Sequence, residues 1–213
     1  MKKLLTIACI CAGFALAGCS SDDGNDNTPA NSLTIDARVE NGNDYNSQID
    51  SVRAFVNDND TEVVATAEYV NGGFTLTLPA NIDSRHLNSI TVPSGLKVSD
   101  RNMKITVIDA YGFVGVKSGQ ITGEFHYIHT FNQGTHDLVS AHFFYVDRNA
   151  TWDGTYIDDD GDVSVWDNVS FKKGWNTVYY TVIHHNDNTN TTTYSTTKPN
   201  VIKWHYFTIS GGI

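Results

Sequence analysis

Cysteine is nearly absent from this chain. The three cysteines are Cys9, Cys11 and Cys19, and none follows Cys19. The rest of the chain therefore forms no disulfide and offers neither a thiol nucleophile nor a cysteine-ligated metal site. We expect its stability to come from a packed core alone.

Basic residues are also scarce. The chain has 14 Lys and Arg against 24 Asp and Glu, a formal net charge of −10. Removal of residues 1–18, which include Lys2 and Lys3 and no acidic residue, takes the net charge to −12. So acidic a chain does not bind nucleic acid or anionic lipid head groups by charge. We therefore expect no nucleic-acid partner, whereas cations would be attracted.

Helical patterning is missing as well. No stretch of about a dozen residues places apolar side chains at a period of 3.6. Short runs instead alternate apolar and polar residues between Gly, Asn and Asp, which is typical of β-strands. We predict an all-β fold, an antiparallel β-sandwich of immunoglobulin or transthyretin type with about 11–13 strands. The predicted strands cover residues 33–39, 49–56, 62–70, 73–78, 103–109, 112–117, 119–128, 139–146, 151–159, 162–171, 175–183, 191–196 and 201–209.

The clearest hairpin turns at Asn71-Gly72, a pair that tolerates the positive φ of a two-residue turn. In this register Tyr69 lies opposite Phe74, and the apolar side chains of both strands share one face. Residues 82–90 are expected to hold a short helical turn that begins near Asp83.

A second hairpin predicts an exposed aromatic side chain. With Asp160-Gly161 as a two-residue turn, Trp152 lies opposite Val169 on a core face, and Trp166 lies opposite Thr155 on a polar face. Exposed aromatic rings stack on sugars and on partner surfaces. Trp166 is therefore the candidate ligand-binding residue. The alternative is that a loop or a second subdomain covers it.

The turn of this hairpin holds the densest carboxylate cluster, with Asp158, Asp160 and Asp162. Clustered carboxylates suit a hard cation such as calcium, so these three residues are the candidate metal ligands. The EF-hand pattern fails, because Tyr156 stands where the first ligand must be acidic. The alternative is an ordinary Asp-Gly turn, and no other cofactor is expected.

The remaining residues give little sign of chemistry. His126 and His129 are three apart, which on a strand points them to opposite faces, so haem or zinc binding is an alternative without a clear ligand set. The sequence contains no Gly-x-Ser-x-Gly elbow, His-Glu-x-x-His motif or phosphate-binding glycine loop. It favours a protein that is not an enzyme.

Asp50-Ser51-Val52 resembles the Asp-Ser/Thr-apolar pattern of O-glycosylation in secreted Bacteroidetes proteins. The resemblance implies that Ser51 carries a glycan. A pattern of three residues also recurs by chance, and this one lies at the start of a predicted strand.

Leu16-Ala17-Gly18-Cys19 follows a short basic start and the apolar run 4–16. That run is too short to span a bilayer, which takes about 20 residues, so residues 1–18 are predicted to be a signal peptide. The tetrad resembles the lipobox of bacterial lipoproteins. The resemblance implies that Cys19 becomes the N-terminus and carries a diacylglycerol and an acyl chain such as palmitate. The alternative is an ordinary secretory signal.

Residues 19–31 begin with a polar, acidic stretch that cannot bury anything, so they are expected to form a disordered tether. Its acidic start resembles the export signal of Bacteroidetes surface lipoproteins, which implies a place on the outer face of the outer membrane. The alternative is a spacer facing the periplasm. Residues 32–213 are expected to form one β domain, with two subdomains divided near 93–101 as the alternative.

Four segments together resemble a group of uncharacterised Bacteroidetes lipoproteins, namely residues 49–54, 71–79, 147–151 and 169–176. The resemblance implies a phylum and a surface location, and it brings no activity. We expect a non-catalytic binding or adhesion module for an extracellular ligand such as glycan, anchored to the membrane by its lipid. The alternatives are a structural or accessory component of an envelope complex and a haem- or calcium-binding lipoprotein.

Overall fold

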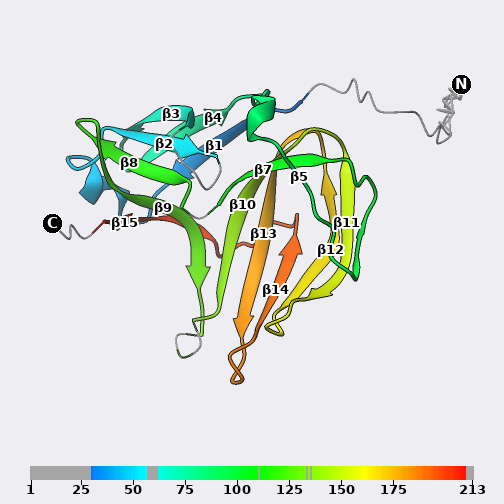
Figure 1. The fold of residues 1–213 in the computed structure, drawn as a ribbon. Coiled ribbons are helices and arrows are strands. Elements are labelled where there is room, and N and C mark those ends of the chain that lie inside the picture. Colours follow the sequence, from blue (N-terminus) through cyan, green and yellow to red (C-terminus); the bar gives the residue numbers. More distant parts are fainter. Residues whose placement is uncertain (1–29, 57–61, 110, 133, 135, 210–213) are drawn as a thin grey trace, which may run out of the picture.

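The computed structural model describes residues 30–56, 62–109, 111–132, 134 and 136–209, and most of them belong to strands (Figure 1). The predicted all-β fold is confirmed. The signal peptide, Cys19 and nearly all of the tether lie outside these residues. Within them the helical elements are two short 3-10 turns, Gly42–Tyr45 and Ser84–His86, and the second begins after Asp83 as predicted. No helix of this part is long and apolar enough to cross a membrane.

Fifteen strands are present in the described residues. The first nine are β1 (Leu33–Arg38), β2 (Ser51–Phe55), β3 (Val63–Val70), β4 (Gly73–Leu78), β5 (Asn88–Ser89), β6 (Leu96–Val98), β7 (Lys104–Ile108), β8 (Phe113–Lys117) and β9 (Gln120–Thr130). The other six are β10 (Leu138–Val146), β11 (Ala150–Ile157), β12 (Val163–Phe171), β13 (Gly174–His184), β14 (Asn190–Ser195) and β15 (Lys203–Thr208). The sequence predicted fewer, because it did not show that the short β5 and β6 pair with other strands.

One continuous sheet runs in the order β1-β4-β3-β2-β8-β9-β10-β13-β14-β12-β11-β6, with β15 on β9, β7 on β10 and β5 on β7. Every pair is antiparallel except β12 with β14. The antiparallel prediction is wrong for this pair. The reason is that β14 inserts between the consecutive antiparallel strands β12 and β13, so it must run parallel to one of them. The sandwich type stays a prediction.

The first predicted hairpin forms at the expected turn. Asn71 and Gly72 have φ values of 53° and 75°, and Tyr69 lies opposite Phe74. Beyond this pair the two strands separate, since β3 pairs with β2 while β4 pairs with β1. The tip of the hairpin therefore joins two parts of the sheet.

A first hydrophobic core lies among β1, β4, β8, β9 and β15. Aromatic rings fill its centre, where Phe74 meets Phe125 at 5.2 Å and Trp204 at 5.5 Å between ring centroids. A backbone bridge between Val39 and Trp204 brings the end of β1 against β15. The strands thus curve until the first and the last in sequence meet.

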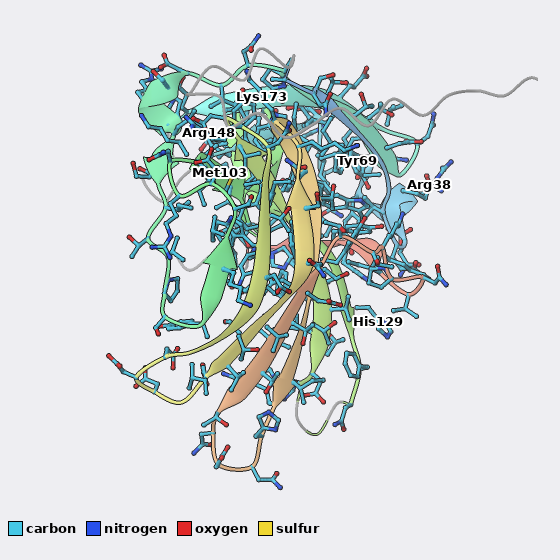
Figure 2. All side chains as sticks on the ribbon, turned by 90° about the vertical axis from the view of Figure 1, so that its right-hand side faces the viewer. Arg38, Tyr69, Met103, His129, Arg148 and Lys173 are labelled. Atoms are coloured by element: carbon cyan, nitrogen blue, oxygen red, sulfur yellow. The ribbon has the colours of Figure 1, made fainter. Side chains whose placement is uncertain are left out.

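A second core lies inside the curl of the other strands. Phe144 of β10 and Phe171 of β12 have ring centroids 5.6 Å apart, although β13 and β14 stand between their strands in the sheet. Because neighbouring strands are about 4.8 Å apart, such contact requires the sheet to bend round, as Figure 1 shows. Met103 closes one end of this core, on the side where Arg148 lies (Figure 2).

The two cores share β10. Phe143 and Tyr145 point into the first core, and Phe144 and Val146 point into the second. The strand is therefore buried on both faces. This explains why its apolar residues form a continuous run, whereas a strand with one solvated face alternates apolar and polar residues.

Asn31, near the start of the described residues, is bonded to the β12–β13 turn. Its N–H donates to the carbonyl of Lys173 at 3.1 Å, and its carbonyl accepts the N–H of Trp175 at 3.2 Å. Gly174 between them has φ of 99°, and a Cβ there would meet the Asn31 backbone. The first described residues are thus held at the β12–β13 turn.

Candidate functional site

Trp166 lies in the second core and not on an exposed polar face. Its side chain is 9% exposed. The ring stacks on Tyr194 at 4.1 Å and lies 4.6 Å from Trp152. The prediction that Trp166 is exposed on a polar face is therefore wrong, because strands of its own sheet, and not a loop or a second subdomain, cover it. Ligand binding by Trp166 stays a prediction.

A longer turn and a β-bulge explain this error. The predicted two-residue turn at Asp160-Gly161 is wrong, because Ile157 pairs with Val163 and residues 158–162 form the loop. Trp152 lies opposite Val169, as predicted, but Gly154 and not Thr155 lies opposite Trp166. Two residues of β12 thus face one residue of β11, and Asn168 takes a positive φ of 47°. The extra residue turns Trp166 to the same side as Trp152.

The Asp cluster shapes its own turn. The Asp158 carboxylate accepts the N–H groups of Asp160 and Asp162 at 3.1 and 2.9 Å. Asp162 in turn accepts the backbone N–H and the side-chain amide of Asn190 at 2.8 and 3.1 Å. In the described part of the chain no group of three or more His, Cys, Asp or Glu is arranged to hold a metal. Calcium binding at these residues stays a prediction.

Ser51 lies at the start of β2, between Glu68 of β3 and Val116 of β8. Ser51 is half-buried. The carboxylate of the neighbouring Asp50 accepts a 2.7 Å hydrogen bond from the Lys117 ammonium at the end of β8. Glycosylation of Ser51 stays a prediction.

Two histidines meet across strands in a way that the sequence does not show. His126 of β9 lies directly opposite His205 of β15, and the His126 ring is 3.2 Å from the Glu124 carboxylate. Their rings also contact Phe207, at 4.8 and 6.3 Å between centroids. This cluster lies on the outer face of the first core.

A groove of about 150 Å³ opens where β1 and β15 meet the convex face of β10 and β13. Tyr127 and Tyr179 are its half-buried aromatic residues, and their ring centroids are 6.5 Å apart. Trp204 and Phe143 lie behind them. The groove thus has an aromatic floor.

Tyr127 is stacked on one side and covered on the other. Its ring lies parallel to Trp204 at 4.9 Å and 14°, and the Lys198 ammonium stands 5.7 Å from its centroid. Lys198 is exposed in the loop before β15, so its long side chain can swing aside at little cost. The Tyr127 face is therefore a site that a flat ligand surface can occupy.

Polar groups complete the groove. Burial raises the pKa of Tyr179 to about 12, and the nearby Tyr127 adds to this shift, so the Tyr179 hydroxyl stays protonated. Thr34 and Asp36, on the exposed face of β1, also line the groove. The Asp36 carboxylate accepts only a 3.3 Å bond from Thr75 among the bonds seen in the described residues. The groove combines aromatic faces, a cation and an acceptor.

Sequence reasoning missed these groove residues. Tyr127, Tyr179 and Asp36 appear in the sequence as ordinary positions of alternating strands, and Lys198 as a loop residue. Nothing in the local pattern brings four distant segments together. Comparison with protein-family models, curated proteins and solved structures finds no match to this chain.

Proposed function

We propose that this protein is a lipid-anchored, non-catalytic binding module that holds a sugar ring of an extracellular glycan in the groove. The proposal depends on one observation: Tyr127, Tyr179, Lys198 and Asp36 line the same groove. A sugar ring has an apolar face of C–H groups and an edge of hydroxyls. Aromatic faces suit the first, and a donor and an acceptor suit the second.

The size of the groove supports a small ligand. Sites for drug-sized molecules have volumes of about 300–1,000 Å³, whereas this groove has about 150 Å³. It therefore accommodates about one ring. The charges of Lys198 and Asp36 cancel, so the groove carries no net charge and favours an uncharged sugar.

A lipid anchor supports the proposed setting. The lipobox-like Leu16-Ala17-Gly18-Cys19 and the acidic stretch behind it motivate a place on the outer face of the outer membrane. A module held there meets glycans from outside the cell.

A glycan array tests the proposed function. The purified full chain is applied to the array, followed by Tyr179→Ala, which removes half of the aromatic floor. We expect binding to at least one glycan and a loss of affinity of about 10-fold in the variant, since a stacked ring contributes about 1 kcal/mol beyond buried area. Tyr111→Ala, on a surface away from the groove, serves as the control and binds normally.

Two results would count against the proposal. Absence of binding to every glycan on the array contradicts the function. Unchanged binding by Tyr179→Ala, with a normal melting curve, contradicts the site.

A partner protein is a second candidate ligand, favoured by one exposed patch. Tyr111 and Phe207 are 67% and 49% exposed, and both rings contact His126. Exposed aromatic rings of this kind occur at protein interfaces. Cross-linking on intact cells followed by purification tests it, and loss of the cross-linked species in Phe207→Ala is the expected result.

A further inference from the structure

A row of side chains crosses the curled sheet from β10 to β11. Ser140 pairs with Tyr180, Tyr180 with Tyr194, Tyr194 with Trp166, and Trp166 with Gly154. Paired residues of neighbouring strands point to the same side of a sheet. The row therefore lies on the concave face, which the second core also occupies.

The rings of this row form a nearly continuous aromatic surface. His142, two residues after Ser140, lies 4.4 Å from Tyr180 between centroids. Tyr180 lies 6.1 Å from Tyr194, and Tyr194 stacks on Trp166 at 4.1 Å and 10°. Four rings thus follow one another across four strands.

These rings are withdrawn from water but not fully covered. Burial raises the pKa of Tyr180 and of Tyr194 and lowers the pKa of His142. All three nevertheless remain partly exposed, whereas Val178 and Phe171 of the same core are fully buried. These rings are therefore partly desolvated and still reachable by a ligand on the concave face.

The register rows of this face carry almost no charge. The next register row, away from the Met103 end, consists of Leu138, Val182, Thr192, Ser164 and Tyr156. The charged group that acts on the aromatic row is Asp109, whose field on His142 is weaker than the effect of burial. Burial of an unpaired charge is costly, so this face suits an uncharged ligand.

One buried donor beside the row has no acceptor. The indole N–H of Trp152, whose ring lies 4.6 Å from that of Trp166, has no hydrogen-bond partner within the described residues. A buried donor left unpaired costs about 1–3 kcal/mol. A ligand with an acceptor on its ring would remove that cost.

From these observations we infer that the concave face holds a second binding site, separate from the groove, for an uncharged small molecule with a flat aromatic ring. We expect the ligand to be flat because aromatic rings line the face. We expect it to be uncharged because the lining residues carry almost no charge. Tyr179 and Tyr180 are adjacent in β13 and point to opposite faces, so the two sites are independent.

Two dyes that differ in charge test this inference. N-phenyl-1-naphthylamine is uncharged, and 1-anilinonaphthalene-8-sulfonate has the same aromatic frame with a sulfonate. We expect the uncharged dye to bind saturably at one site and to quench tryptophan fluorescence. The sulfonate should bind at least about 10-fold more weakly, because its charge has no partner. No saturable binding of the uncharged dye, or equal affinity for both, overturns the inference.

Variants locate the dye. Tyr194→Ala should weaken binding of the uncharged dye by about 10-fold, and Tyr194→Leu tests the same point if the smaller side chain impairs folding. Thr193→Ala changes the neighbouring exposed residue on the other face and should bind normally. If Phe207→Ala abolishes binding while both Tyr194 variants retain it, the dye sits on the outer patch and the inference is wrong.

Discussion

His142 is held neutral by its surroundings. It lies between the rings of Tyr180 and Phe144, with centroid distances of 4.4 and 6.0 Å. Burial lowers its pKa below the ordinary value of 6.5, and the Asp109 carboxylate opposes this shift without cancelling it. The folded chain therefore resists a proton that the unfolded chain accepts.

This difference predicts a pH dependence of stability. As pH falls below 6.5, the unfolded chain takes up a proton at His142 and the folded chain does not, so the free energy of unfolding decreases until the pH reaches the folded pKa. His142→Gln should reduce the loss between about pH 7 and pH 5. Urea unfolding across this range measures it, with the exposed His185→Gln as control. Equal slopes in all three proteins would contradict the prediction.

At the scale of single elements, the pairing of a strand with its neighbours decides its register where the local sequence pattern does not. Alternation located most strands, and Asn71-Gly72 fixed a turn and a register, because both signals depend on neighbours in the chain. The five-residue loop 158–162 and the bulge at Asn168 have no such local signal, and together they place Trp166 in the core and not on a polar face. Likewise β6 is recognisable only through its pairing with β11.

Gly154 shows how closely these elements approach. It has φ of 127°, and a Cβ there would lie 2.3 Å from the Gly95 carbonyl oxygen beside β6. Gly154→Ala should lower the free energy of unfolding by about 2–4 kcal/mol, from backbone strain and from separation of β6 and β11. Chemical denaturation measures the change.

Gly119→Ala is the matched control for this prediction. Gly119 also has a positive φ, of 85°, but nothing lies within 4 Å of its Cβ position. Its substitution should cost only the backbone strain, about 1 kcal/mol. If Gly154→Ala costs no more than Gly119→Ala, the close approach of β6 is not important for stability.

The whole molecule is organised by β10, the strand that its two larger cores share. A third, smaller cluster of Val139, Ala141 and Ile202 packs against Tyr127 and Tyr179 of the groove. Because β10 is buried on both faces, it joins the two larger cores into one structure. The groove lies where β1 and β15 of the first core meet the convex face of β10 and β13. No sequence pattern predicts such a junction, since it depends on how the sheet bends. The groove and the concave face were therefore invisible to sequence reasoning, whereas the all-β class was not.

Anchoring is tested on the whole chain in its native cell. Cys19→Ala should shift the protein from the membrane fraction to the soluble fraction and abolish incorporation of labelled palmitate. Cys9→Ala, in the predicted signal peptide, should change neither. Retention of Cys19→Ala in the membrane fraction, or labelling that persists in it, would contradict the proposed anchor.

The backbone bonds of Asn31 limit how far the proposed binding sites would stand from the membrane under the proposed anchoring. Its two backbone bonds to the β12–β13 turn end the tether at a fixed point of the fold. If Cys19 carries the proposed lipid, the chain between Cys19 and Asn31 can extend to about 40 Å at most. The groove begins at Leu33, just beyond that point. Under the proposed anchoring, the proposed binding sites would therefore sample only a thin layer next to the membrane, and a ligand would have to reach into that layer.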